Sequence, residues 1–101
     1  MLTIEEITRK LTPIFEASGV TRAILFGSYA KGNATEDSDI DLVIETEPHV
    51  RGIWIYAIFG DVRDMFDIDD IDVDIFHRQD VKPGGRVHNE VAQTGMVIYE
   101  R

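Results

Sequence analysis

The stretch FGSYAKGNATEDSDIDLVI, residues 26–44, decides the fold of this chain. An apolar run ends at Gly27-Ser28, a polar loop follows, and a second apolar run contains two acids, Asp39 and Asp41. Apolar and polar positions alternate in this second run, which predicts a strand whose two acids face the same side.

The placement of these acids needs a physical reason. Aspartate is a poor strand former, and two like charges side by side repel each other unless a cation lies between them. A half-exposed strand that shows two acids to solvent would explain one such pair. However, the segment IDVDIF (71–76) repeats the pattern with Asp72 and Asp74. Two acid-bearing strands favour a metal site, and carboxylates without His or Cys suit Mg²⁺ or Mn²⁺.

The Gly-Ser pair is suited to phosphate. A glycine at a strand end allows close approach of a ligand, and a helix start offers free N–H groups. Ser28 adds a hydroxyl, and Lys31 follows one turn later as either a phosphate contact or a solvated lysine. Gly-Ser alone is more often a turn with a helix cap. Because Mg²⁺ completes its shell with water and substrate phosphates, the acids and the turn together indicate a nucleotide site.

The rest of the chain alternates helix and strand patterns, which predicts an α/β (α+β) fold with a small mixed sheet and helices. Thr3 and Glu6 match a capping box, and Pro13 is expected to bend the first helix or end it early. The run IWIYAIF (53–59) suits a buried helix. Helices are predicted over 3–17, 28–31, 50–66 and 86–94, and strands over 20–26, 39–45, 71–76 and 96–99.

Composition limits the class of protein. The 101 residues suit one domain, 1–101, and 44% hydrophobic residues allow a core. The lack of cysteine excludes disulfides and thiolate sites and fits a cytosolic location. The net charge of −9, with only ten basic residues, argues against direct nucleic-acid binding. The polar N-terminus and short apolar runs argue against a signal peptide or a membrane span.

The spacing of the opening motif resembles a known family. Gly27-Ser28, ten intervening residues and then Asp39-Ile40-Asp41 form the G-S-x10-D-x-D pattern of nucleotidyltransferases similar to DNA polymerase beta. The order of elements extends this resemblance over nearly the whole chain, with the palm-like fold of that superfamily. Since no second domain is evident, the chain looks like a minimal nucleotidyltransferase of the type encoded beside HEPN-domain toxins.

The resemblance implies a role for each motif residue. Gly27 and Ser28 would hold the phosphates of the nucleoside triphosphate. Asp39 and Asp41 would bind two metal ions, Mg²⁺ or Mn²⁺.

A third carboxylate is expected on the next strand of this family. Val73-Asp74-Ile75 fits its pattern, so Asp74 is the predicted third ligand, which would also help to deprotonate the attacking hydroxyl. Asp72 lies on the same predicted face and remains the alternative. Lys31 stands where arginine is common in the family, so the charge is kept without the planar fork.

The resemblance also implies a reaction and a partner. The protein would be an antitoxin that transfers a nucleoside monophosphate, AMP from ATP, to a hydroxyl of a HEPN-type toxin. The acidic composition favours a protein acceptor. The alternative is a non-catalytic binding module that neutralises its partner by contact, because a fold does not guarantee activity.

Other features have simpler explanations. The run DIDDIDVD (67–74) lacks the glycine at the sixth position and the glutamate at the twelfth position that a calcium loop needs. The histidines show no metal-ligand spacing, although His77 and Arg78 follow the third strand and would lie near the site.

Two apolar patterns are expected to serve the core. Trp54, Tyr56 and Phe59 are interpreted as core residues rather than a surface for stacking bases. Val87 and Val91 would pack the last helix onto the core, with a partner-facing helix as the alternative.

Overall fold

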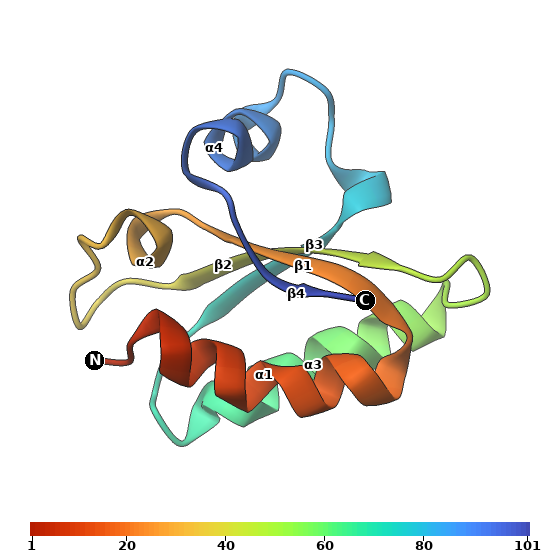
Figure 1. The fold of residues 1–101 in the computed structure, drawn as a ribbon, viewed down its shortest axis with the longest axis horizontal. Coiled ribbons are helices and arrows are strands. Elements are labelled where there is room, and N and C mark those ends of the chain that lie inside the picture. Colours follow the sequence, from red (N-terminus) through yellow and green to blue (C-terminus); the bar gives the residue numbers. More distant parts are fainter.

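The computed structural model describes all residues, 1–101, and has the predicted alternation of helices and strands (Figure 1). A short 3₁₀ turn, Arg78–Asp80, is the only element beyond that prediction. The elements are α1 (Ile4–Ser18), β1 (Val20–Phe26), α2 (Ser28–Lys31), β2 (Ile40–Thr46), α3 (Ile53–Asp67), β3 (Val73–His77), α4 (Arg86–Thr94) and β4 (Met96–Glu100).

The strands form one mixed sheet in the order β3-β2-β1-β4. β1 is antiparallel to both of its neighbours, whereas β2 and β3 are parallel. Parallel neighbours need a crossover connection, and α3 supplies it. The predicted small mixed sheet with helices is therefore confirmed.

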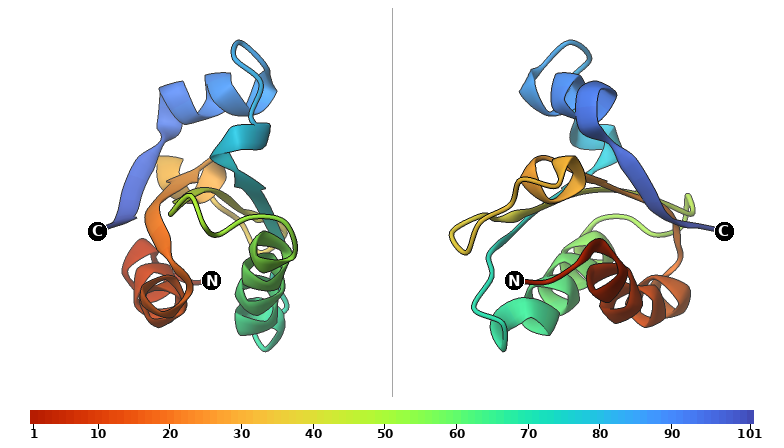
Figure 2. Two further views of the ribbon diagram at one scale, coloured as in Figure 1. Left: turned by 90° about the vertical axis from the view of Figure 1, so that its right-hand side faces the viewer. Right: turned by 60° about the vertical axis from the view of Figure 1, so that its left-hand side comes forward.

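The helices cover both faces of this sheet. Figure 1 shows α1 and α3 side by side under one face, while α4 lies over the opposite face; Figure 2 shows the same layers from two other directions. The main core lies between the sheet and the α1–α3 layer. Its largest fully buried members are Phe15, Phe66, Ile7, Leu11, Leu25, Ile40, Leu42, Ile44, Val20 and Val62.

α1 begins as predicted and ends later than its proline suggested. The Thr3 hydroxyl accepts from the Glu6 N–H at 3.1 Å, and the Glu6 carboxylate accepts from the Thr3 N–H at 3.0 Å. Pro13 does not end the helix, which continues to Ser18. Pro13 and Arg9 both lie on the exposed side, where water can bond the Arg9 carbonyl that the proline leaves without a partner.

The prediction of a buried 53–59 helix is wrong for Trp54 and Tyr56, whereas Phe59 packs against the core. Trp54 is 66% exposed and Tyr56 is 72% exposed, while Phe59 is half-buried. A helix beside a sheet buries only one stripe, and in α3 that stripe is Ile55, Ile58, Val62 and Phe66. None of the helices has the length and apolar composition that a membrane span requires.

Candidate active site

The predicted site residues gather where β1 ends and where β2 and β3 begin. In the strand register, Asp41 of β2 lies opposite Phe26 of β1 on one side and Asp74 of β3 on the other. Gly27 directly follows Phe26, so the end of β1 lies beside the acids. Neighbouring strands are about 4.8 Å apart, which brings the backbones of the two aspartates close together.

The acids face away from the main core. Ile40 and Leu42 are fully buried in that core, so the alternation of the strand directs Asp41 to the α4 side, while Asp39 lies just before β2. Val73 and Ile75 belong to the same core, and Asp74 therefore projects to the α4 side as well.

The register distinguishes the two candidates for the third carboxylate. β3 begins at Val73 rather than at residue 71, which leaves Asp72 just before the strand. The Asp72 carbonyl accepts from the Ile40 N–H at 3.0 Å. Asp72 therefore lies beside Asp39, and both come two residues before the paired Asp41 and Asp74 in their segments. Asp74 is thus the direct cross-strand neighbour of Asp41, and its role as the third carboxylate stays a prediction.

Negative charge is concentrated at this edge. The pKa of Asp41 is raised to about 6, first by burial and then by the carboxylates of Asp74, Glu90 and Asp39, while Arg86 lowers it. The pKa of Asp39 is also raised, by partial burial and by Asp74 and Asp72. Burial and neighbouring carboxylates both disfavour the charged form of these two side chains. A cation bound between the carboxylates would reduce this repulsion.

Gly27 lies directly against the Asp41 carboxylate. Its backbone has φ +78° and ψ −152°, a conformation that is essentially restricted to glycine. A Cβ atom at this position would overlap Asp41 Oδ2 and lie 3.2 Å from its Cγ. The Gly27-Ser28 turn and Asp41 thus share one small space, which joins the two halves of the motif that opened the sequence.

α2 begins immediately after this glycine. The first residues of a helix have N–H groups without a partner within the helix, and here these groups follow Gly27. Ser28 is half-buried at the first position, and Lys31 is exposed at the last. The turn therefore offers backbone donors and a hydroxyl next to the carboxylates.

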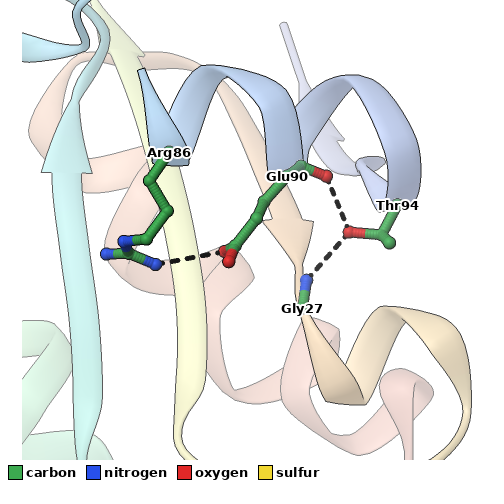
Figure 3. Close-up of polar contacts among 4 residues, drawn as sticks. All are labelled: Gly27, Arg86, Glu90 and Thr94. Carbon is green, nitrogen blue, oxygen red and sulfur yellow. Dashed lines mark hydrogen bonds and ion pairs between the residues drawn. The ribbon is translucent and has the colours of Figure 1, made fainter.

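A polar row on α4 closes the site from the other side (Figure 3). Arg86 Nη1 pairs with Glu90 Oε2 at 3.2 Å, and the Thr94 hydroxyl donates to the Glu90 carbonyl at 2.9 Å. The Gly27 N–H donates to Thr94 Oγ1 at 3.0 Å. Gly27 is thus bonded to the last residue of α4, which comes 67 positions later in the chain.

Sequence reasoning did not identify this row, although a signal existed. Arg86, Glu90 and Thr94 are spaced i, i+4 and i+8, which places them on one helix face. Val87 and Val91, which were expected to join the core, are only half-buried on α4. This spacing does not predict which part of the protein the polar face of α4 would contact.

The expectation that His77 lies near the site is wrong. His77 is paired in register with Ile44, towards the opposite end of β2 from Asp41. It is buried at 8% exposure, and its Nε2 lies 2.8 Å from Thr46 Oγ1. The Gln79 N–H donates to Nδ1 at 3.1 Å, so the proton is on Nε2 and the ring is neutral. Its role is structural.

The residues present fit a hard divalent cation. All candidate ligands are carboxylates in or directly before adjacent strands, and those of Asp41 and Asp39 repel other acids nearby. No three His, Asp or Glu side chains converge into a ready-made metal cage. Mg²⁺ does not need one, because it is commonly held by one or two carboxylates and completes its shell with water and phosphate.

Comparison with known proteins is consistent with this geometry. The model of the nucleotidyltransferase domain family matches residues 3–93. A protein adenylyltransferase named MntA from Thermococcus cleftensis is 45% identical over 51 residues, which are 46% of this chain and 52% of the relative. A protein of Methanocaldococcus jannaschii named for the same activity is 50% identical over 44 residues, 44% of this chain and 47% of the relative. The chain thus spans about half the length of the curated relatives it matches.

Solved structures share the fold. A toxin–antitoxin structure with AMP-PNP superposes with a TM-score of 0.72 and 19% identity, over 93% of this chain and 73% of that chain. A complex of the tri-AMPylated HEPN toxin of Shewanella oneidensis with an MNT antitoxin gives a TM-score of 0.67 and 16% identity, over 98% and 74%. At such identities the likeness shows the fold alone.

Proposed function

The chain belongs to the nucleotidyltransferase domain family, and on that premise we propose that it transfers AMP from ATP to a hydroxyl group of a partner protein. The observation that carries the proposal is the contact of Gly27 with the Asp41 carboxylate, with Asp74 on the next strand. A phosphate-binding turn and paired carboxylates within one small space are what phosphoryl chemistry requires. The names of the archaeal relatives support adenylyl transfer.

The proposed reaction is a displacement at the α-phosphorus of ATP. The oxygen of the acceptor hydroxyl forms a bond to the α-phosphorus, the bond from that phosphorus to the β-phosphate bridging oxygen breaks, and pyrophosphate leaves. The Ser28 hydroxyl and the backbone N–H groups at the start of α2 would bind the triphosphate and orient it.

The carboxylates would bind the metal ions that the reaction requires and accept the proton of the attacking hydroxyl. Asp39, Asp41 and Asp74 would hold Mg²⁺ or Mn²⁺, which when bound neutralises phosphate charge and stabilises the attacking and leaving oxygens. Asp74 would also accept the proton of the attacking hydroxyl, since it is exposed at the start of β3.

We infer that the acceptor is a HEPN-type toxin and that this protein is its antitoxin. Two of the solved neighbours are toxin–antitoxin structures, and one of these contains an AMPylated HEPN toxin. The net charge of −9 is unfavourable for a nucleic-acid acceptor and compatible with a basic protein partner.

Label transfer tests this function. The protein is incubated with Mg²⁺, the product of the neighbouring gene and ATP labelled at either the α- or the γ-phosphate. We expect label on the partner from α-labelled ATP only, with the mass increase of AMP. Transfer from γ-labelled ATP would indicate a kinase. No transfer, with the partner still inhibited in the complex, would favour the non-catalytic antitoxin.

Matched variants test the site. Asp39→Asn with Asp41→Asn should abolish transfer, whereas Asp64→Asn, an exposed acid on α3, should leave it unchanged. Asp74→Asn should reduce transfer by at least about 100-fold if it is the base, because general bases contribute that much. A larger loss from Asp72→Asn than from Asp74→Asn would show that Asp72 is the third carboxylate.

A further inference from the structure

Thr94, the last residue of α4, contacts the nucleotide turn directly. Its hydroxyl oxygen accepts from the Gly27 N–H at 3.0 Å and donates its proton to the Glu90 carbonyl at 2.9 Å (Figure 3). The second bond fixes the orientation of the hydroxyl, because its single proton is used within α4. A lone pair of the Thr94 oxygen therefore points at the Gly27 N–H, and the two hydrogen bonds together fix the orientation of the hydroxyl.

Gly27 has no other partner for this N–H. The pairing of β1 ends at Phe26 with β2 and at Leu25 with β4. The half-buried Gly27 N–H would be left without a protein partner if the Thr94 hydroxyl were removed. Thr94 thus determines the direction of the first peptide after β1, the peptide from which the phosphate turn begins.

The end of α4 is itself held against β1. The Gly95 N–H donates to the Val91 carbonyl at 2.8 Å, which closes the helix. A Cβ atom at Gly95 would overlap that carbonyl and lie 3.1 Å from Ile24 Cγ2 of β1. The close packing of the end of α4 on β1 therefore holds Thr94 next to Gly27.

We propose that Thr94 is a positioning residue of the nucleotide site: its hydroxyl holds the Gly27 peptide so that the turn presents its phosphate donors at a fixed place beside Asp41. The inference rests on the proposed function, since the ligand of the turn is the triphosphate of ATP. The physical reason is that Gly27 already touches the Asp41 carboxylate, so a tilt of this peptide changes the geometry between phosphate and metal ligands.

Two substitutions separate this role from simple packing. Thr94→Val keeps the shape and removes the hydroxyl, while Thr94→Ser keeps the hydroxyl. We expect Thr94→Val to raise the KM for ATP by roughly fivefold, as the loss of one hydrogen bond implies, and to leave the KM for the partner protein unchanged. Thr94→Ser should return the KM for ATP to within about twofold of the wild type.

A readout independent of turnover accompanies the kinetics. Titration of Mg²⁺-ATP is followed by NMR at the amide of Ser28, and the amide proton of Gly27 is observed in the free protein. Thr94→Val should shift the Gly27 amide upfield and weaken the Mg²⁺-ATP titration, and Thr94→Ser should reverse both changes.

The outcomes distinguish the inference from the function. A wild-type KM for ATP and a wild-type titration in Thr94→Val would overturn the positioning role, even if the melting temperature falls. Absence of AMP transfer by the wild type would overturn the proposed function, and the NMR titration would then decide the inference alone. No binding of Mg²⁺-ATP by the wild type would overturn both.

Discussion

Substitution of Gly27 by alanine tests the contact on which the site depends. Gly27 has φ +78° and ψ −152°, where an L-residue is strained by about 1–3 kcal/mol. The new Cβ would also overlap Asp41 Oδ2, so the carboxylate must move, which adds about 1 kcal/mol or more. Gly27→Ala should therefore lower the free energy of unfolding by about 2–4 kcal/mol.

Thermal unfolding followed by circular dichroism measures this effect. In a domain of this size, each kcal/mol lowers Tm by about 4–8 °C, so we expect a fall of at least about 8 °C. AMP transfer should fall by at least about 100-fold in the fraction that remains folded, because a displaced Asp41 would no longer hold the proposed metal ion in place.

A double-mutant cycle isolates the overlap from the backbone strain. In Asp41→Ala the carboxylate is absent, and only the Cβ of residue 41 remains, 3.6 Å from a Cβ at position 27, which is an ordinary contact. Gly27→Ala should then be about 1 kcal/mol less destabilising than in the wild type. Equal destabilisation in both backgrounds would refute the contact.

Gly32→Ala is the matched control. Gly32 also has a positive φ of +80°, but nothing lies within 4 Å of the place that a Cβ atom would occupy there. This variant should lose about 1–2 kcal/mol from backbone strain and keep its transfer activity.

Three further predictions concern stability. Without metal, Asp41→Asn should raise the free energy of unfolding by about 1 kcal/mol at pH 7.5, a figure reduced for solvent screening. Because the folded pKa of Asp41 is raised from 3.8 to about 6, the gain should vanish as the pH falls from 6 to 4 in urea titrations. Burial lowers the pKa of His77 in the folded protein, so as the pH falls His77 is protonated in the unfolded chain before it is protonated in the folded chain. Stability should fall as the pH drops below about 6.5, and His77→Gln should remove this part of the pH dependence. Gly60→Ala, inside α3 with open space around a Cβ, should raise Tm by about 4–8 °C in a melting experiment; a lower Tm would contradict this packing.

Local rules of sequence predicted much of the fold. The order of helices and strands, the capping box of Thr3 and the ends of α2 and α4 depend on residues close together in the chain. The same holds for the motif itself. Gly27 directly follows β1, and Asp41 lies in β2, the antiparallel neighbour of β1 that follows α2 and a loop, so the pairing of the two strands brings both residues together.

The hydrophobic pattern of the sequence did not predict which face of α3 is buried. The apolar residues of α3 occur all around the helix near Trp54, and their periodicity did not say which would be left in solvent. Burial was decided by the position of the sheet and of α1, which cover the stripe through Ile55 and Ile58. Hydrophobicity specifies that a residue can be buried, whereas packing decides whether it is.

The sequence by itself determined that this chain has a Gly-Ser turn followed by paired acids, because both features are local. Only the tertiary structure decided that Asp74, rather than Asp72, lies beside Asp41, since a period of two identifies a strand face but not its register with a neighbour. It also decided that Thr94 bonds Gly27. That contact joins distant parts of the chain through the packing of α4 on β1, which no short-range pattern encodes.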